Sequence, residues 1–309
     1  MLQYAVRRVA WLIPTLLAMA LVTFIIMHAT PGSPLDPAAP NANPLSPELQ
    51  RNLAEKYGLD KPLYVQFWTF LKNVVRLDFG FSYMFKTRTV SEIIAGTFPI
   101  SLQLGIMAFV FAAIGGVTLG TLAAVHQNSW IDYLCVILAT MGVSLPNFVT
   151  GILLILLFAL TLGLFPVSGW DSPRNWVLPT LTLGLPELGI VARYTRASVL
   201  EVVRADFART ARAKGVAERK VVTRHVLKNA LIPIVTYLGP LLAAIGTGSF
   251  FVEFIYSIPG MGKFFVQSMS GRDYNMIMAV ILLYGGFLGL MNLVVDLAYG
   301  LLDPRIKYG

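Results

Sequence analysis

The sequence has a single cysteine and few charged residues. Cys135 is the only cysteine among 309 residues, so neither an intrachain disulfide nor a cluster of thiolate metal ligands can form. Charged residues make up only 13% of the chain, whereas hydrophobic residues make up 56%, and the mean hydropathy is +0.69. This balance excludes an ordinary water-soluble globule and indicates a membrane protein.

The sequence also lacks the residue patterns of a membrane hydrolase and of an ATPase. It contains no HExxH or GxSxG, and its three histidines lie at or beyond the ends of the hydrophobic segments. The stretch SIPGMGKFF at 257–265 superficially resembles a phosphate-binding loop. However, Ser257 replaces the required glycine and Phe264 replaces the hydroxyl residue that binds magnesium. We therefore expect no enzyme activity and no cofactor in this chain.

Six segments are long and apolar enough to cross a bilayer core of roughly 30 Å, which takes about 20 helical residues. They cover residues 9–27, 100–125, 131–164, 177–192, 230–251 and 276–301. The third segment is too long for one straight helix and contains Pro146. It is therefore either two crossings or one crossing that is kinked or broken at this proline.

The distribution of charge decides between these alternatives. Residues 193–228 hold ten Lys or Arg against three acidic residues, a net charge of +7, and Arg7 and Arg8 precede the first segment. Short loops rich in Lys and Arg stay in the cytoplasm. Only a single crossing by residues 131–164 puts both clusters there. The sequence thus predicts an all-α membrane protein of six transmembrane helices, with an uncleaved first span and both termini in the cytoplasm.

Residues 31–98, between the first two spans, are polar and of mixed charge, and we expect them to form a small helical domain outside the cytoplasm. The pair Ser46–Pro47 fits an N-cap and a first helical position, and Gly58 can end that helix. A second helix is expected to start at Pro62. Its apolar face would hold Leu63, Phe67, Leu71 and Val74. Ser91 is expected to cap a third, short helix.

The basic loop, residues 193–228, is expected to form a helix, a turn and a second helix. Good helix formers fill residues 197–213, Gly215 follows as a natural helix end, and Glu218 can start the next helix. The first helix should carry an apolar stripe of Val199, Val203, Phe207 and Ala211.

Small and basic side chains share this loop. The small ones, which would let the loop pack closely into a groove, are Ala205, Ala208, Ala211 and Ala213. The basic ones, which offer charge to a partner or to lipid, are Arg209, Arg212 and Lys214. The loop could anchor on anionic lipid, bind nucleic acid or dock a cytoplasmic protein. Tethering at both ends disfavours nucleic acid, and the residues alone leave the other two interpretations open.

The stretch ARTARAKGVAERKVVTRHVLKNALIPIVT at 208–236 resembles the cytoplasmic coupling loop of ABC importer permeases of the dipeptide and oligopeptide branch. The general importer pattern is Glu-Ala-Ala, three residues, then Gly. With Gly215 aligned, only Ala211 matches it, whereas RTARAKG is similar to the peptide branch almost letter for letter. Further similar stretches are RRVAWLIPTLL at 7–17, PGSP at 31–34, LDFGFS at 77–82, EFIYSIPGMGKFF at 253–265, GRDY at 271–274 and NLVVDLAYGLLDPRI at 292–306.

The resemblance implies a type I ABC importer permease fold in a bacterial inner membrane. Residues 1–30 would form the cytoplasmic N-terminus and first span, 31–98 the extracytoplasmic domain, and 99–309 the transmembrane domain of spans two to six. The partners implied are a related but distinct permease, two ATPase subunits that bind ATP and magnesium, and an external binding protein. The residues implied to couple this chain to the ATPases are Arg209, Thr210, Ala211, Arg212, Ala213, Lys214 and Gly215.

The function expected is therefore that of a permease that forms half of the translocation pathway of a peptide importer. Nickel complexes, glutathione and sugars or opines are alternative cargoes in the same branch. An ion-coupled secondary carrier is the rival class, and it would require inverted repeats with a polar site at the midplane, neither of which is clear in this sequence. Guesses for the polar lining of the pathway are Ser144, Asn147, Glu187, Thr247 and Ser249, for which ordinary helix–helix hydrogen bonding is the alternative role.

Overall fold

The computed structural model describes residues 2–35, 47–85 and 87–302. Within these residues the regular secondary structure is helical, apart from an isolated bridge between Phe81 and Thr89. It divides into two compact units. The first contains the residues up to Ile100 together with Pro259–Leu293, and the second contains Ser101–Ile258.

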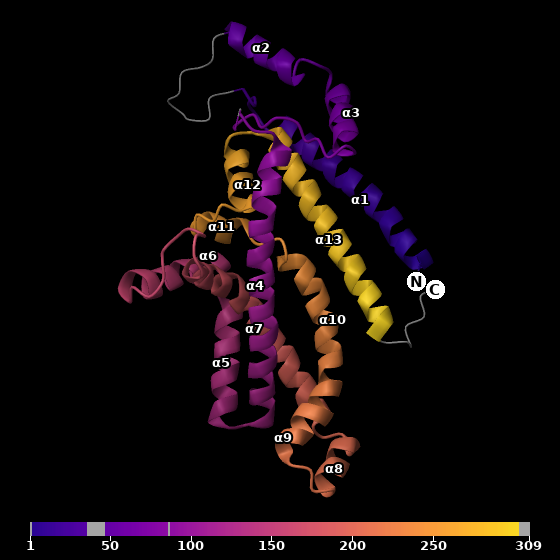
Figure 1. Cartoon of the computed structure of the whole chain (residues 1–309), viewed down its shortest axis with the longest axis vertical. Coiled ribbons are helices and arrows are strands. Elements are labelled where there is room, and N and C mark those ends of the chain that lie inside the picture. The colour runs from indigo at the N-terminus through magenta and orange to yellow at the C-terminus, as the bar shows by residue number, and fades with distance from the viewer. Residues whose placement is uncertain (1, 36–46, 86, 303–309) are drawn as a thin grey trace. The chain divides into compact units, whose positions relative to one another are not determined.

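In the first unit, α1 packs against α13 through glycines of α13 (Figure 1). The unit holds α1 (Leu2–Ala29), α2 (Pro47–Tyr57), α3 (Leu63–Val74), α12 (Met261–Ser270), most of α13 (Tyr274–Leu302) and the start of α4 (Val90–Val125). A β-carbon on Gly285 would stand 2.7 Å from Met19 Cε, and one on Gly289 would stand 2.2 Å from Leu12 Cδ1. These two glycines therefore permit close helix packing, whereas a β-carbon on Gly286 would meet nothing within 4 Å.

The ends of α2 and α3 agree with the sequence. Helix α2 begins at Pro47 and ends at Tyr57, and Gly58 follows it with a φ of +68°, a conformation that glycine adopts without a steric penalty. Pro62 directly precedes α3, as predicted. Ser46, the expected N-cap of α2, lies outside the described residues.

The predicted short helix capped by Ser91 is wrong in both respects. Thr89 and Glu92 form a capping box, in which Thr89 Oγ1 accepts from the Glu92 amide at 3.2 Å and Glu92 Oε2 accepts from the Thr89 amide at 3.1 Å. The helix that starts there is α4, 36 residues long. Ser91 instead donates its hydroxyl to the carbonyl of Leu77 at 2.9 Å.

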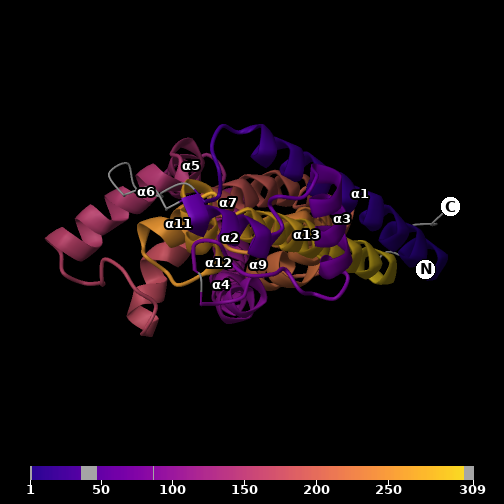
Figure 2. The ribbon, with the colours of Figure 1, turned by 90° about the horizontal axis from the view of Figure 1, so that it is seen from above.

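In the second unit, α5 and the segment after it meet at a sharp angle. Helix α5 (Trp130–Ser144) and the pair α6 (Asn147–Leu154) and η1 (Ile155–Thr161) are bent by 111° at Pro146 (Figure 2). The proline has no amide hydrogen to continue the helix. The helix is therefore broken at this residue, and the number of crossings made by residues 131–164 stays a prediction.

Helix α7 (Pro173–Val202) is the central helix of the second unit. A β-carbon on Gly120 of α4 would stand 2.3 Å from the carbonyl oxygen of Ala192, and one on Gly189 would stand 2.1 Å from the carbonyl oxygen of Ala139 in α5. Helices α4 and α5 thus both lie in backbone contact with α7. The remaining elements are α8 (Asp206–Ala213), α9 (Glu218–Lys220), η2 (Val221–Val226), α10 (Leu227–Ile245) and α11 (Phe250–Ile255).

Four helices of the described chain are long and apolar enough to cross a membrane, and the bent pair would be a fifth. The four are Val6–Ala29, Val90–Val125, Glu218–Ile245 and Tyr274–Asp296. Helix α7, which holds the fourth segment expected from the sequence, is not among them. Many of its side chains, including Thr182 and Thr195, are buried against other helices. The count of six spans stays a prediction.

Candidate functional site

The basic loop folds into a compact elbow at one end of α7 and α10 (Figure 1). Helix α7 ends at Val202, α8 follows after a short break, and the chain turns at Gly215 into α9, η2 and α10. The predicted order of helix, turn and helix is therefore confirmed.

The single helix predicted over residues 197–213 is wrong, because the chain leaves the helix at 203–205. Ala205 is extended, with φ −65° and ψ 153°, and α8 starts at the next residue. The break rotates α8 relative to α7. Phe207, which the sequence places on the buried stripe, is 43% exposed, while Ala208 is fully buried.

The elbow has an apolar core of its own. Its buried members are Ala124, Val199, Ala208, Ala211, Val221, Val226 and Ala230. They come from α4, α7, α8, η2 and α10. The alanines at 208 and 211 are therefore occupied inside the elbow, which corrects the expectation that they lie on a surface free to enter a groove.

Gly215 closes α8 with the two hydrogen bonds of a Schellman motif. Its amide donates to the carbonyl of Arg212 at 2.9 Å, and the Val216 amide donates to the carbonyl of Ala211 at 3.2 Å. The φ of Gly215 is +76°, and a β-carbon there would meet nothing within 4 Å. The need for glycine is thus conformational rather than a matter of space.

Arg212 braces the elbow from inside. Its Nε and Nη2 bind the carboxylate of Glu218 at 3.0 and 2.8 Å, and its Nη1 donates to the carbonyl of Val203 at 3.0 Å. Hydrogen bonding from Arg212 lowers the pKa of Glu218. The sequence offers Arg212 as free charge for a partner, but its guanidinium is engaged with both ends of the break and turn.

The outer surface of α8 holds the other expected coupling residues. Arg209, Thr210, Ala213, Lys214 and Gly215 are all exposed. Arg209 lies 3.7 Å from Asp206, an exposed contact of little energetic weight. We call the outward-facing surface formed by these five residues and Phe207 the α8 face.

Two ion-pair residues at the base of the elbow were not predicted. Asp132, at the start of α5, holds Arg196 of α7 through contacts of 2.7 and 2.8 Å. Ser129 Oγ accepts from the Asp132 amide, which makes Ser129 the N-cap of α5. The spacing Ser129-x-x-Asp132 is a helix-start signal that could have pointed to this carboxylate.

The five guessed pathway residues lie on different elements of the second unit. Glu187 of α7 accepts from the hydroxyl of Tyr237 at 3.2 Å, and Ser144 donates to the carbonyl of Thr140 in its own helix at 2.8 Å. Thr247 is buried, while Asn147 and Ser249 are half-buried at the starts of α6 and α11. Their role in a pathway stays a prediction.

Three of the similar motifs meet in the first unit. Ser82 of LDFGFS hydrogen-bonds the buried carboxylate of Asp273 in GRDY, which also accepts from the amides of Met84 at 3.3 Å and Met276 at 3.2 Å. A β-carbon on Gly32 of PGSP would collide with the guanidinium of Arg272. Three stretches that lie far apart in the sequence therefore form one packed junction.

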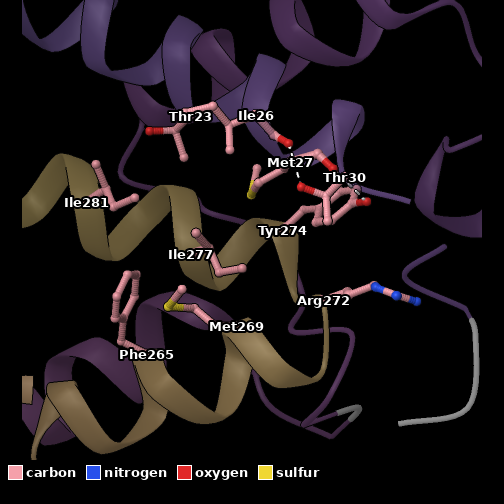
Figure 3. A pocket seen from close by; sticks show the side chains of 10 residues that line it. All are labelled: Thr23, Ile26, Met27, Thr30, Phe265, Met269, Arg272, Tyr274, Ile277 and Ile281. Atoms are coloured by element: carbon pink, nitrogen blue, oxygen red, sulfur yellow. Dashed lines mark hydrogen bonds between the residues drawn. The ribbon is translucent and has the colours of Figure 1, made fainter. Parts of the chain in front are cut away.

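Next to this junction lies a small pocket between α1, α12 and α13 (Figure 3). The hydroxyl of Tyr274 donates to the carbonyl of Met27 at 3.2 Å and ties α13 to the end of α1. The pocket has a volume of about 280 Å³, and its walls include Met269 and Ile277. Nearby, burial and then the charge of Asp273 raise the pKa of Tyr83.

Comparison with known proteins identifies the class. The family described as "Binding-protein-dependent transport system inner membrane component" matches residues 116–308, and the family of the corresponding N-terminal component matches residues 1–105. The chain therefore belongs to the binding-protein-dependent permeases, the membrane-embedded subunits of ABC importers, and is a multi-pass inner membrane protein.

The similarity to known proteins extends over the whole chain or nearly so. The dipeptide transport system permease protein DppB of Bacillus subtilis (strain 168) is 43% identical over 99% of this chain and 98% of its own. The oligopeptide transport system permease protein OppB of Escherichia coli (strain K12) is 39% identical over 100% of both chains. The glutathione transport system permease protein GsiC of Escherichia coli O1:K1 / APEC is 43% identical, again over 100% of both.

Solved structures agree in fold. The MetNI methionine ABC transporter matches with a TM-score of 0.54 and 17% identity, over 68% of this chain and 96% of that chain. A crystal structure of an amino acid ABC transporter with histidines matches with a TM-score of 0.51 and 17% identity, over 70% of this chain and 95% of that one. These likenesses confirm the all-helical ABC importer permease fold.

Proposed function

We propose that this chain is the permease of an ATP-driven importer for peptides. The observation that carries the proposal is the 43% identity to a dipeptide permease over 99% of the chain. Relatives named for oligopeptides and for glutathione, itself a tripeptide, match over the full length at 39% and 43%. Peptides as a class therefore fit better than nickel complexes or sugars.

The proposed assembly contains a second, related permease, two ATPase subunits and an external binding protein. ATP and magnesium would be bound by the ATPases, and both termini of this chain and the basic loop would lie in the cytoplasm. The charge of the loop supports this orientation, because positively charged short loops are retained inside. Residues 31–98 would then lie outside and help to receive the binding protein.

The α8 face is the proposed contact with an ATPase subunit. It presents Phe207, a large apolar side chain that is 43% exposed, and it also carries the cations of Arg209 and Lys214. An exposed aromatic ring is typical of a residue that anchors in a partner's pocket. Phe207 therefore joins the coupling residues expected from the sequence.

Movement of α8 would be passed to the two helices at the base of the elbow. Val199 of α7 and Ala230 of α10 belong to the same apolar core as Ala208 of α8. A displacement of α8 on ATP-driven closure would therefore tilt α7 and α10, with Gly215 at the turn between them. Ser144, Asn147, Glu187, Thr247 and Ser249 stay proposed as polar lining of the pathway that this tilt opens.

The contact can be tested by purification of the assembly. Phe207→Ala and Lys214→Glu should each lower the amount of ATPase subunit that copurifies with this chain. Lys228→Glu is the matched control, because it makes the same charge change at an exposed residue of the basic loop outside α8. Equal ATPase recovery from all three variants would rule out the α8 face as the contact.

The rival class is tested by the energy source. Uptake of a labelled dipeptide should continue when ionophores collapse the ion gradients while ATP is maintained, and it should stop when ATP is removed. Uptake that instead follows the ion gradient would establish an ion-coupled carrier.

A further inference from the structure

Helix α3 carries an exposed row of aromatic and aliphatic side chains. Tyr64 is 76% exposed, Trp68 71% and Val75, just after the helix, 86%. Their spacing of four and seven residues puts them on one side of a helix. A protein surface seldom leaves such a row to water, so a partner or a membrane is expected to cover it.

The same side of α3 borders two apolar grooves of the first unit. Phe67 packs on Phe24 of α1, with ring centroids 5.2 Å apart. One groove, of about 490 Å³, lies between the C-terminal half of α1 and the start of α3. The other, of about 560 Å³, has walls that include Leu17 of α1, Leu71 of α3 and Leu283 of α13.

Two walls of the larger groove belong to helices long and apolar enough to span a membrane, α1 and α13. In the membrane, either lipid or another membrane subunit covers such surfaces. The charges near the groove favour lipid. Lys72 and Arg76 are exposed at the end of α3, and among the described residues neither has an acidic partner within ion-pair distance.

The opposite side of α3 is more polar. Gln66, Thr69 and Asn73 line a cleft of about 250 Å³ that also contains Asp78 and Lys56. The helix thus separates an apolar side from a polar side, with basic residues near the boundary. Trp, Tyr and Lys or Arg in this arrangement are typical of a helix that lies in the interface of a bilayer.

We propose that α3 lies in the surface of the membrane and that the groove beside it holds an acyl chain of an anionic phospholipid. The aromatic row of Tyr64 and Trp68 enters the headgroup region, and Lys72 and Arg76 bind the lipid phosphate. Long basic side chains reach a headgroup while their stems stay on apolar surface. Each cation near an anionic surface contributes on the order of fivefold in affinity. The proposal does not depend on the cargo of the importer.

The test uses the full chain in its purified assembly, in proteoliposomes and with Cys135→Ala as background. An environment-sensitive fluorophore is attached at Trp68→Cys or, as matched control, at Thr69→Cys on the polar side of the same helix. The vesicles contain phosphatidylcholine with either brominated phosphatidylglycerol or brominated phosphatidylcholine as quencher. We expect quenching at position 68, little quenching at position 69, and a several-fold preference for phosphatidylglycerol that Lys72→Gln with Arg76→Gln abolishes.

Three outcomes would overturn the proposal. Equal quenching at positions 68 and 69 would show that α3 is not oriented on the bilayer. Quenching of position 68 by aqueous iodide but not by brominated lipid would place the helix in water. Protection of position 68 from both quenchers in the assembly would show that a protein subunit, and not lipid, covers the groove.

Discussion

Asp132 of α5 and Arg196 of α7 are joined by two parallel hydrogen bonds of 2.7 and 2.8 Å. The carboxylate is nearly inaccessible, with its side chain 3% exposed, and it also accepts from the Asn128 amide at 3.0 Å. A buried charge held at this many points is well compensated, and loss of one partner leaves the other stranded. The pair therefore fixes the junction of α5 and α7 beneath the elbow.

Removal of one partner should weaken the fold strongly. We expect Asp132→Ala to lower the free energy of unfolding by about 3–5 kcal/mol, because Arg196 would keep its charge without a counterion. Arg196→Lys should cost less, since it keeps the charge but loses the two-point geometry. Thermal unfolding of the purified permease measures both.

The control for that pair is the exposed contact of Arg204 with Gln127, at 3.0 Å. Gln127→Ala should change stability by no more than about 0.5 kcal/mol. An Asp132→Ala protein as stable as Gln127→Ala would show that the buried pair does not stabilise the junction.

The brace between Arg212 and Glu218 should depend on pH. Arg212 lowers the pKa of Glu218 below its ordinary value of 4.5. A carboxyl whose pKa is lower in the folded state stabilises the fold above its unfolded pKa and loses that effect as the pH falls through the lowered value. Hydrogen exchange of amides 206–216, corrected for intrinsic rates, should therefore become faster below pH 4.5.

Glu218→Gln is the variant that checks this assignment. It should show faster exchange than the native chain at neutral pH and no further acid-dependent change in residues 206–216. Exchange that accelerates with acid equally in the variant and the native chain would mean that another group titrates.

At Gly215 the backbone conformation, not the space, should decide which substitutions are tolerated. A β-branched residue at a φ of +76° is strained by roughly 1–2 kcal/mol, whereas asparagine adopts this conformation more readily. We expect Gly215→Val to lower peptide uptake per ATP hydrolysed and Gly215→Asn to stay near the native ratio. A native ratio for an assembled Gly215→Val protein would remove Gly215 from the coupling mechanism.

Two helical glycines should respond in opposite ways to alanine. A β-carbon on Gly120 would stand 2.3 Å from the backbone carbonyl of Ala192, so Gly120→Ala must push α4 from α7 at a cost of about 1–3 kcal/mol. Gly286→Ala meets nothing within 4 Å and should be neutral or stabilising by up to about 1 kcal/mol. The melting temperatures of the two purified variants give the comparison, and equal values would contradict it.

Features set by local chemistry are predictable from this sequence. Pro47 and Gly58 mark the ends of α2, because a proline tolerates the first helical position and a glycine tolerates the left-handed turn. Pro146 breaks the third apolar segment for an equally local reason. The order of helix, turn and helix in the basic loop follows from Gly215 in the same way.

Features set by distant contacts are not predictable in this manner. Thr89 and Ser91 are both possible caps, and the choice depends on the Leu77 carbonyl, which occupies the hydroxyl of Ser91. The helix break before α8 contains no proline or glycine. It forms where Arg212 donates a hydrogen bond to the carbonyl of Val203. The periodicity of apolar residues in the sequence does not reveal this contact.

Helix α7, whose residues 177–192 the sequence marks as a span, is more polar than the other long helices for a physical reason. A helix surrounded by other helices needs no apolar surface toward lipid, so a threonine such as Thr182 can be buried there when its hydroxyl finds hydrogen-bond partners. The Thr182 hydroxyl is shared between the Leu178 carbonyl and the hydroxyl of Tyr256, each at 2.8 Å. Hydrogen bonds of this kind, between residues far apart in the sequence, can be seen only in the structure.

The apolar core of the elbow lowers the entropic cost of binding a partner. Because Val199, Ala208 and Val221 are already packed together, binding of a partner does not have to order the loop and carries no entropic cost for doing so. The binding free energy of the partner then comes from contacts with the surface of the elbow. A displacement of α8 moves α7 and α10 directly, because the elbow has no loose segment that would absorb the motion.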